Sequence, residues 1–142
     1  MSRALTFVVP DLPNSDLNPN VKMHWAAKSR LVKEEREMWY MGIWAVGQEQ
    51  GVKWDKDKPV LHCKILFELT YPDRRQRDKD NIMASLKSCI DTLCAPKHNK
   101  DGTPRLSIIK DDSPDCLTEV PTLELLYEQG VKRTKITIEE VE

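Results

Sequence analysis

The sequence lacks any long apolar run, and no stretch approaches the roughly 20 consecutive apolar residues that a membrane helix needs. Its first residues also lack the basic region, apolar stretch and small-residue cleavage site that define a secretory signal peptide. Internal repeats and low-complexity tracts are absent too. These absences predict a cytoplasmic protein that makes no membrane contact.

A strong charge of one sign is also missing. The 142 residues carry a formal net charge of −1, although 32% of them are charged. This balance excludes attraction of the whole molecule to nucleic acid or membrane, so any basic surface must come from local clustering. With 39% hydrophobic residues, a chain of this length predicts one globular domain over residues 1–142.

None of the four cysteines belongs to a CxxC pair. Cys89, Cys94 and His98 follow one another closely, but their spacing matches no compact structural zinc site. In a reducing compartment we therefore expect all four cysteines to be buried free thiols.

Apolar patterning predicts the main elements. Residues 4–9 indicate a first strand, and residues 24–50 a long helix with apolar pairs seven residues apart. Alternation over 60–71 predicts a second strand, residues 81–93 a second helix, and residues 106–109 a short strand.

The chain closes with two apolar segments, residues 122–128 and 135–141, which we expect to pair with each other around residues 129–133. The order of elements favours an α/β (α+β) class. It predicts a single-domain sandwich in which two main helices pack on a mixed sheet.

The long helix is predicted to have two faces. The apolar stripe, which begins at Trp25 and continues through Trp39, is expected to be buried. The other face carries basic residues that either extend a DNA-binding surface or are simply solvated, and three glutamates offset them. The basic residues are Lys28, Arg30, Lys33 and Arg36, and the glutamates are Glu34, Glu35 and Glu37.

Two aspartates, Asp78 and Asp80, interrupt a basic run just before the second predicted helix. In an extended segment residues i and i+2 point the same way, so both carboxylates can converge on one ligand. Along the helix, Asp80, Ala84, Lys87 and Asp91 are spaced to lie on a single stripe.

A second acidic pair, Asp111 and Asp112, follows the predicted short strand. If it meets Asp78 and Asp80, the shared pocket is unfavourable unless a divalent ion or protonation relieves the repulsion. Carboxylate oxygens suit Mg²⁺ or Mn²⁺.

Basic residues surround the first acidic pair: Arg74, Arg75, Arg77 and Lys79. Guanidinium and ammonium groups gather in this way where phosphates are bound. Carboxylates that bind metal, ringed by cations, are typical of sites for phosphodiester hydrolysis.

Each feature also has a structural interpretation. Asp78 or Asp80 can be a helix cap, and Asp111 and Asp112 can belong to a turn. The basic run can be a solvated loop whose charges neutralise one another.

The stretch "RDKDN…LK…IDTL…KDDSPD", residues 77–115, resembles the RusA-like Holliday-junction resolvases of bacteriophages and prophages. The upstream "LNPNVKMHWAAKSR", residues 17–30, is similar to the loop and helix start of phage members. The resemblance implies a small homodimeric α/β endonuclease that uses Mg²⁺ or Mn²⁺ to resolve four-way DNA junctions, in a bacterial or phage-infected host cell.

The resemblance also implies roles for individual residues. Asp78, Asp80 and Asp112 match the metal-binding aspartates of the family, with Asp111 as the adjacent acid. Lys87 matches a helical lysine that contacts the scissile phosphate. Asp91 matches a frequent family aspartate, which we interpret as a partner that orients Lys87.

The chain departs from the family in its long polar connection between the helix and the late acidic pair, residues 94–109. This connection is either a surface insertion, which we favour, or an additional DNA-contacting arm. At the start of the long helix, Trp25 is expected in the core, and His24 either contacts DNA or caps the helix.

The resulting hypothesis is a metal-dependent nuclease acting on branched DNA. One alternative is a non-catalytic DNA-binding protein of the same fold. Another is an interaction or regulatory protein without a nucleic-acid role, in which the acids are only caps and turns.

Overall fold

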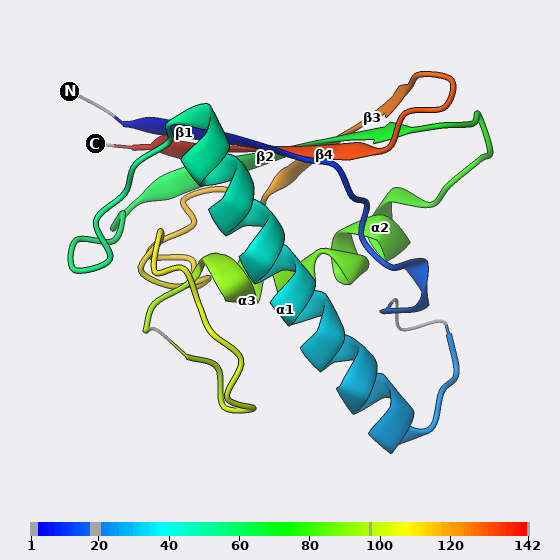
Figure 1. Cartoon of the computed structure of the whole chain (residues 1–142), viewed down its shortest axis with the longest axis horizontal. Helices are drawn as coiled ribbons and strands as arrows, with labels where there is room; N and C mark the ends of the chain where they lie inside the picture. The colour runs from blue at the N-terminus through cyan, green and yellow to red at the C-terminus, as the bar shows by residue number, and fades with distance from the viewer. Residues whose placement is uncertain (1–2, 18–20, 97, 142) are drawn as a thin grey trace.

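The computed structural model describes residues 3–17, 21–96 and 98–141 as a mixed four-stranded sheet with helices packed on one face (Figure 1). This confirms the predicted α/β (α+β) class, whereas the homodimer and the single-domain extent stay predictions. The strands are β1 (Ala4–Val9), β2 (Cys63–Tyr71), β3 (Thr122–Tyr127) and β4 (Arg133–Glu140); the helices are α1 (Trp25–Gln50), α2 (Lys79–Ser85), α3 (Lys87–Leu93) and the short 3-10 helix η1 (Ser15–Leu17).

The strands lie in the order β1-β4-β2-β3, in which β4 is antiparallel to β1 and β2 and β3 is parallel to β2. The predicted pairing of the two closing strands is therefore wrong, because β2 lies between them. Burial gives the physical reason: Thr134, Ile136 and Ile138 of β4 are buried, as a central strand requires, while β3 is half-buried or exposed, as an edge strand can be.

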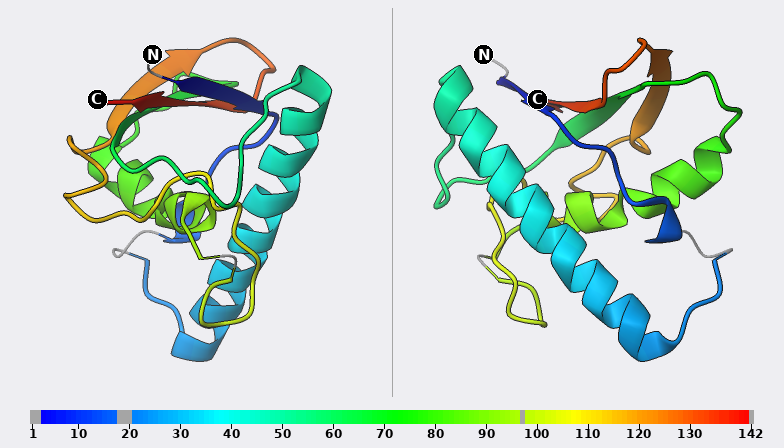
Figure 2. Two further views of the ribbon diagram at one scale, coloured as in Figure 1. Left: turned by 90° about the vertical axis from the view of Figure 1, so that its left-hand side faces the viewer. Right: turned by 45° about the vertical axis from the view of Figure 1, so that its right-hand side comes forward.

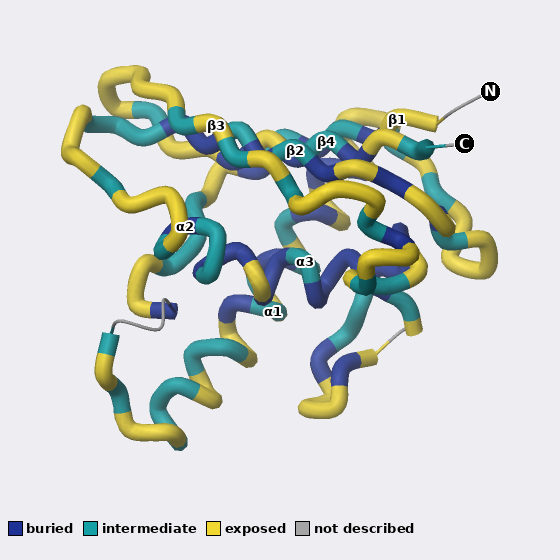
Figure 3. The backbone as a smooth tube through the Cα atoms, turned by 180° about the vertical axis from the view of Figure 1, so that it is seen from behind, coloured by how far each residue is buried: buried dark blue, intermediate teal, exposed yellow. Residues whose placement is uncertain are grey.

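Helix α1 crosses beneath the sheet and contacts both β1 and α3 (Figure 2). Its second half carries the core residues Trp39 and Ile43, which are fully buried. No residue in the first ten of the helix is buried, and its first turns extend beyond the sheet (Figure 3). The prediction that Trp25 lies in the core is wrong: Trp25 is 77% exposed, because no element formed by residues 3–17, 21–96 and 98–141 packs over this end of the stripe.

The helix predicted over residues 81–93 is present but divided. It begins earlier, as α2, and a turn at the buried Leu86 separates α2 from α3. Lys87 and Asp91 keep their spacing of four residues within α3, whereas Asp80 and Ala84 belong to α2. The predicted stripe of four residues therefore spans two helices.

Residues 106–109 do not form the predicted strand. Ile109 makes isolated bridges with Val60 and Cys94, and Leu106 and Ile108 are buried beside it. Ser107 adopts a left-handed φ of 54°, which interrupts the extended backbone that a strand needs. None of the helices formed by the described residues has the length and apolar character required for crossing a membrane.

Glu35 was expected on the solvated face of α1, but it is buried, with only 7% of the residue exposed. Its Oε2 accepts hydrogen bonds from the backbone N–H of Asn14 and from Nε1 of Trp39, both at 3.2 Å. Burial raises the pKa of the Glu35 carboxyl, although these two hydrogen bonds act in the opposite direction. Glu35 thus ties the loop after β1 to α1 while its charge is only partly compensated.

Glu35→Gln is expected to remove the cost of a buried charge while keeping one oxygen that can accept both hydrogen bonds. Because the folded-state pKa is raised, the wild-type protein loses stability as pH rises through that pKa. The free energy of unfolding of the variant relative to wild type should therefore be greater at pH 8 than at pH 4, as measured by urea denaturation. Glu37→Gln, on an exposed position of the same helix, is the control, and an equal pH dependence for both variants would contradict this account.

Candidate active site

Contacts of the Arg77 side chain hold the loop between β2 and α2. Its guanidinium lies 3.8 Å from the centre of the Tyr71 ring and forms a 2.7 Å ion pair with Asp73. It also donates to the carbonyl oxygens of Asp73 and Arg75 at 3.3 and 3.0 Å. Hydrogen bonds from the Arg75 backbone and from Arg77 hold the pKa of Asp73 below its ordinary value. Arg77 was predicted to bind DNA, but its side chain is only 20% exposed and its main contacts support the loop.

The other three predicted DNA-binding cations are more accessible. Arg74 stacks over the ring of Tyr127 at 4.6 Å, and the Arg75 side chain is 81% exposed beside Asp73. Lys79 reaches the carbonyl oxygen of Leu123 at 3.5 Å, too long for a strong bond. Arg74 and Lys79 thus lie towards β3, whereas the exposed Arg75 makes a 3.3 Å ion pair with Asp73.

Asp78 is the N-cap of α2. Its Oδ1 accepts hydrogen bonds from the backbone N–H groups of Asp80 at 2.8 Å and Asn81 at 3.4 Å. The cap interpretation is therefore correct for Asp78, and among the described residues its Oδ2 has no partner. Asp80 lies exposed in the first turn of the same helix.

A cavity of about 430 Å³ opens beside Asp78, between α2, the end of β2 and the loop that follows β1. Apolar groups, including Leu12 and Tyr71, form part of its lining. Three cations and two acids also line it: Arg75, Arg77, Lys132, Asp73 and Asp78. The cavity is thus a concave, mixed-charge surface next to one of the predicted metal ligands.

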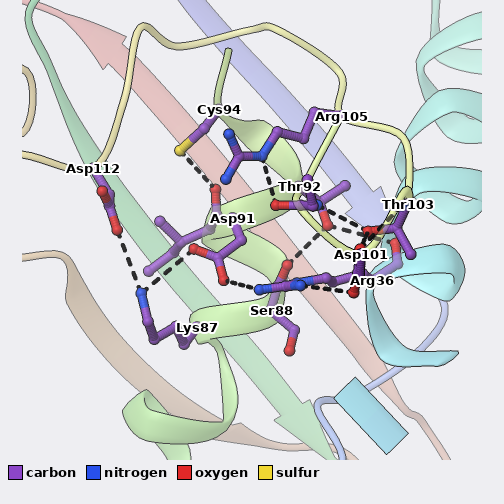
Figure 4. Close-up of polar contacts among 12 residues, drawn as sticks. Arg36, Lys87, Ser88, Asp91, Thr92, Cys94, Asp101, Thr103, Arg105 and Asp112 are labelled. Carbon is purple, nitrogen blue, oxygen red and sulfur yellow. Dashed lines mark hydrogen bonds and ion pairs between the residues drawn. The ribbon is translucent and has the colours of Figure 1, made fainter. Parts of the chain in front are cut away.

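Lys87 connects the helical segment to the late acidic pair. Its Nζ lies 3.4 Å from Oδ1 of Asp91 and 3.4 Å from Oδ2 of Asp112 (Figure 4). Partial burial acts to lower the pKa of Lys87, but the two carboxylates outweigh it and the pKa lies above its ordinary value. Lys87 is therefore a cation at neutral pH, and the structure brings Asp112 to it from 25 residues away in the sequence.

Asp111 behaves as a turn residue. Its Oδ1 accepts from the backbone N–H of Ser113 at 2.9 Å and from the Ser113 hydroxyl at 2.5 Å. These hydrogen bonds lower the pKa of Asp111. The turn interpretation is correct for Asp111, while the neighbouring Asp112 directs its carboxylate to Lys87.

Arg36 of α1 forms the inner part of this network. Its Nη2 lies 2.9 Å from Oδ2 of Asp91, and its Nη1 lies 2.8 Å from Oδ2 of Asp101. Burial acts to lower the pKa of Arg36, but the two carboxylates outweigh it and raise the pKa. The expectation that Arg36 lies on the exposed basic face is wrong. Arg36 lies three residues before the buried Trp39, on the same stripe of α1 as Trp39 and Ile43. A charged residue on a buried stripe indicates a partner of opposite charge.

The long connection after α3 is a packed loop and not a loose surface insertion. Asn99 and Thr103 are buried and joined by a 3.0 Å hydrogen bond, and Nε of Arg105 donates to Oδ1 of Asn99 at 2.7 Å. Lys97 lies outside the described residues. The loop brings Asp101 onto α1, so it contributes to the network around Lys87.

The four cysteines are buried free thiols, as predicted. Burial raises the pKa of Cys94 to about 12, and burial together with Cys116 raises that of Cys63 to about 12. The thiols of Cys63 and Cys94 therefore stay protonated at neutral pH, so these two are poor nucleophiles and poor metal ligands.

The predicted carboxylates offer the hard oxygen donors that Mg²⁺ or Mn²⁺ prefers. Over residues 3–17, 21–96 and 98–141, however, no three His, Cys, Asp or Glu side chains form a ready metal site. Asp112 meets Lys87, but Asp78, Asp80 and Asp112 are not assembled into one set. The donor chemistry fits the ion, and the convergence of the two acidic segments stays a prediction.

Two substitutions at Asp78 separate its cap from its charge. Asp78→Ala is expected to lower the free energy of unfolding by about 1 kcal/mol because two N–H groups of α2 lose their acceptor. Asp78→Asn should stay close to wild type, since asparagine caps helices equally well. Urea denaturation in metal-free buffer measures both, with Asp115→Ala, at an exposed turn position, as the control. Equal losses for the Ala and Asn variants would show that the charge, not the cap, stabilises the helix.

Neither a scan against protein-family models nor a search of curated proteins finds a match for this chain. The likeness to RusA-like resolvases therefore rests on the residues of the sequence itself.

Proposed function

We propose that the chain is a divalent-metal-dependent endonuclease that resolves Holliday junctions and other branched DNA. The observation that carries this proposal is the position of Lys87 between Asp91 and Asp112. The late acidic segment thereby contacts α3, the helix that follows α2, and Asp78 and Asp80 lie at the start of α2. Cation and carboxylates on one surface are what phosphodiester hydrolysis requires.

In this proposal Asp78, Asp80 and Asp112 hold Mg²⁺ or Mn²⁺. When bound there, the ion would activate water and stabilise charge on the phosphoryl oxygens. Asp78 can contribute its Oδ2 without giving up the helix cap, which uses Oδ1. Asp111 supports the site mainly as the turn residue beside Asp112, because its Oδ1 is held by Ser113.

Lys87 is assigned the phosphate. Its raised pKa keeps the amine protonated at neutral pH, so it serves as a positive charge and not as a base. The side chain is 69% exposed, which lets the ammonium reach a DNA backbone. The two carboxylates lie at the long limit for hydrogen bonds, so a phosphate oxygen can compete for the same group.

DNA binding is assigned to two basic regions, since the overall charge of −1 provides no general attraction. The first contains Arg74, Arg75 and Lys79, and Arg77 holds the loop that carries the two arginines. The second combines the segment before α1 with the first turns of α1: in the sequence, residues 17–33 carry four Lys or Arg and no acid, and Trp25 is exposed. His24 caps this helix by accepting from the N–H of Ala26, which supports a structural role for its side chain.

Resolution of a four-way junction needs two cuts in opposed strands. A twofold homodimer provides two identical sites at a fixed separation. The expected partners are therefore a second copy of the chain and branched DNA.

A non-catalytic DNA-binding protein of the same fold is the second candidate. One observation favours it: no three potential metal ligands stand together among the described residues. The two candidates differ in cleavage and not in binding.

Cleavage of a four-way junction in Mg²⁺ or Mn²⁺ tests the proposal. Asp80→Asn and Asp112→Asn should each lower the single-turnover rate by about a hundredfold or more, because each removes a charged ligand. Asp115→Asn is the matched control, since its exposed carboxylate has no partner in the described part of the chain. A wild-type protein that binds the junction without cutting it would favour the second candidate. Undetectable affinity at low salt would overturn both.

Trp25→Ala should weaken junction binding by about tenfold, because base stacking on an exposed aromatic contributes roughly 1–3 kcal/mol. Fluorescence anisotropy with labelled junction DNA in EDTA measures affinity without cleavage. Trp44→Ala is the control, because Trp44 lies on the same helix and is 44% exposed but is outside the basic start. Equal affinities for the Trp25 variant and wild type would remove this end of α1 from the DNA surface.

A further inference from the structure

Arg36 binds two carboxylates that come from different segments. One belongs to Asp91 of α3 and the other to Asp101 of the packed loop, at 2.9 and 2.8 Å (Figure 4). The Arg36 side chain is 20% exposed and that of Asp91 is 11% exposed, so water screens this pair only weakly. The two Nη groups of Arg36 make these contacts with the carboxylates. Its Nε is buried and has no hydrogen-bond partner in the described structure.

Asp91 divides its two oxygens between two cations. Its Oδ2 makes the short contact with Arg36, and its Oδ1 faces Lys87 at 3.4 Å. The short, charge-assisted bond determines the orientation of the carboxylate, because a rigid guanidinium fixes its partner better than a flexible ammonium does. Lys87 is therefore guided by Asp91 without being locked into a tight ion pair.

The packed loop holds the other side of Arg36. Asp101 accepts hydrogen bonds at its Oδ1 from the backbone N–H of Thr103 at 3.0 Å and from the Thr103 hydroxyl at 2.5 Å. This leaves Oδ2 for Arg36. The loop is anchored in turn by the bonds between Asn99, Thr103 and Arg105.

We propose that Arg36 is a positioning residue, which sets the location of the Lys87 ammonium through Asp91 and is itself held by Asp101 of the packed loop. The catalytic consequence rests on the proposed nuclease function. The positioning does not, because it concerns only contacts within the chain.

Cleavage rates test whether Arg36 affects catalysis through Lys87. Arg36→Met should lower the single-turnover cleavage rate by about tenfold to a hundredfold, since small displacements of a site residue have effects of this size. Junction affinity in EDTA should change by less than about twofold, and Arg36→Lys should restore part of the rate. In a Lys87→Met background, Arg36→Met should cause no further loss, because the two residues act in series. An equal loss in both backgrounds would overturn the proposal, and Arg30→Met, at an exposed position of α1, is the control.

A second measurement does not depend on cleavage. The NMR resonance of the Lys87 NH₃⁺ group, assigned with Lys87→Arg, should differ from those of exposed lysines in the wild-type protein. In Arg36→Met the Lys87 resonance should move to the position of exposed lysines. In Arg36→Lys and Asp101→Asn it should move part of the way. In the control, Arg30→Met, it should not move. An unchanged Lys87 resonance in a folded Arg36→Met protein would overturn the positioning role. If the wild-type protein never cuts DNA, the proposed function fails, and this resonance still decides the role of Arg36.

Discussion

The packing of α1 against β1 and α3 is the constraint on which the rest of the structure depends. Along one stripe of α1, Ile43 and Trp39 pack into the apolar core, and Arg36 continues that stripe into a polar junction. The fixed spacing of a helix links these two environments, so the same packing that buries Trp39 brings a guanidinium against Asp91. The core and the candidate active site are therefore parts of one interface.

In the network around Lys87, each charged side chain contacts one of opposite sign, and charges of one sign do not gather. Arg36 and Lys87 alternate with Asp91, Asp101 and Asp112, so each of these three carboxylates has a cation within 3.4 Å. In such an arrangement a buried charge is tolerated because each neighbour compensates part of its lost hydration. The network is exposed at Lys87 and Asp112, which is where the proposed function places phosphate and the divalent ion. The buried end at Arg36 stays fixed.

The residues that the proposed function connects with DNA binding are of two kinds. Arg77 is consumed by its ion pair and its contact with the Tyr71 ring, so it shapes the loop that presents Asp78. Arg75 remains exposed, and Trp25, the first residue of α1, is exposed. Under the proposed function, the DNA surface would combine the loop held by Arg77 with the exposed ring of Trp25, on which an unpaired base could stack.

Local patterns in the sequence determined β1, the long helix α1, β2 from its fourth predicted residue onward, the helical character around Lys87, and the caps and turns at Asp78 and Asp111. Each depends on residues close in the chain, where periodicity and side-chain hydrogen bonding act directly. Tertiary structure alone decided that β4 rather than β3 lies in the centre of the sheet, that Trp25 is exposed, and that Asp112 and Arg36 meet the Lys87–Asp91 pair. These contacts join residues 25 and 55 positions apart, and no local pattern encodes which distant partner satisfies a charge. Only the packing of the elements does so.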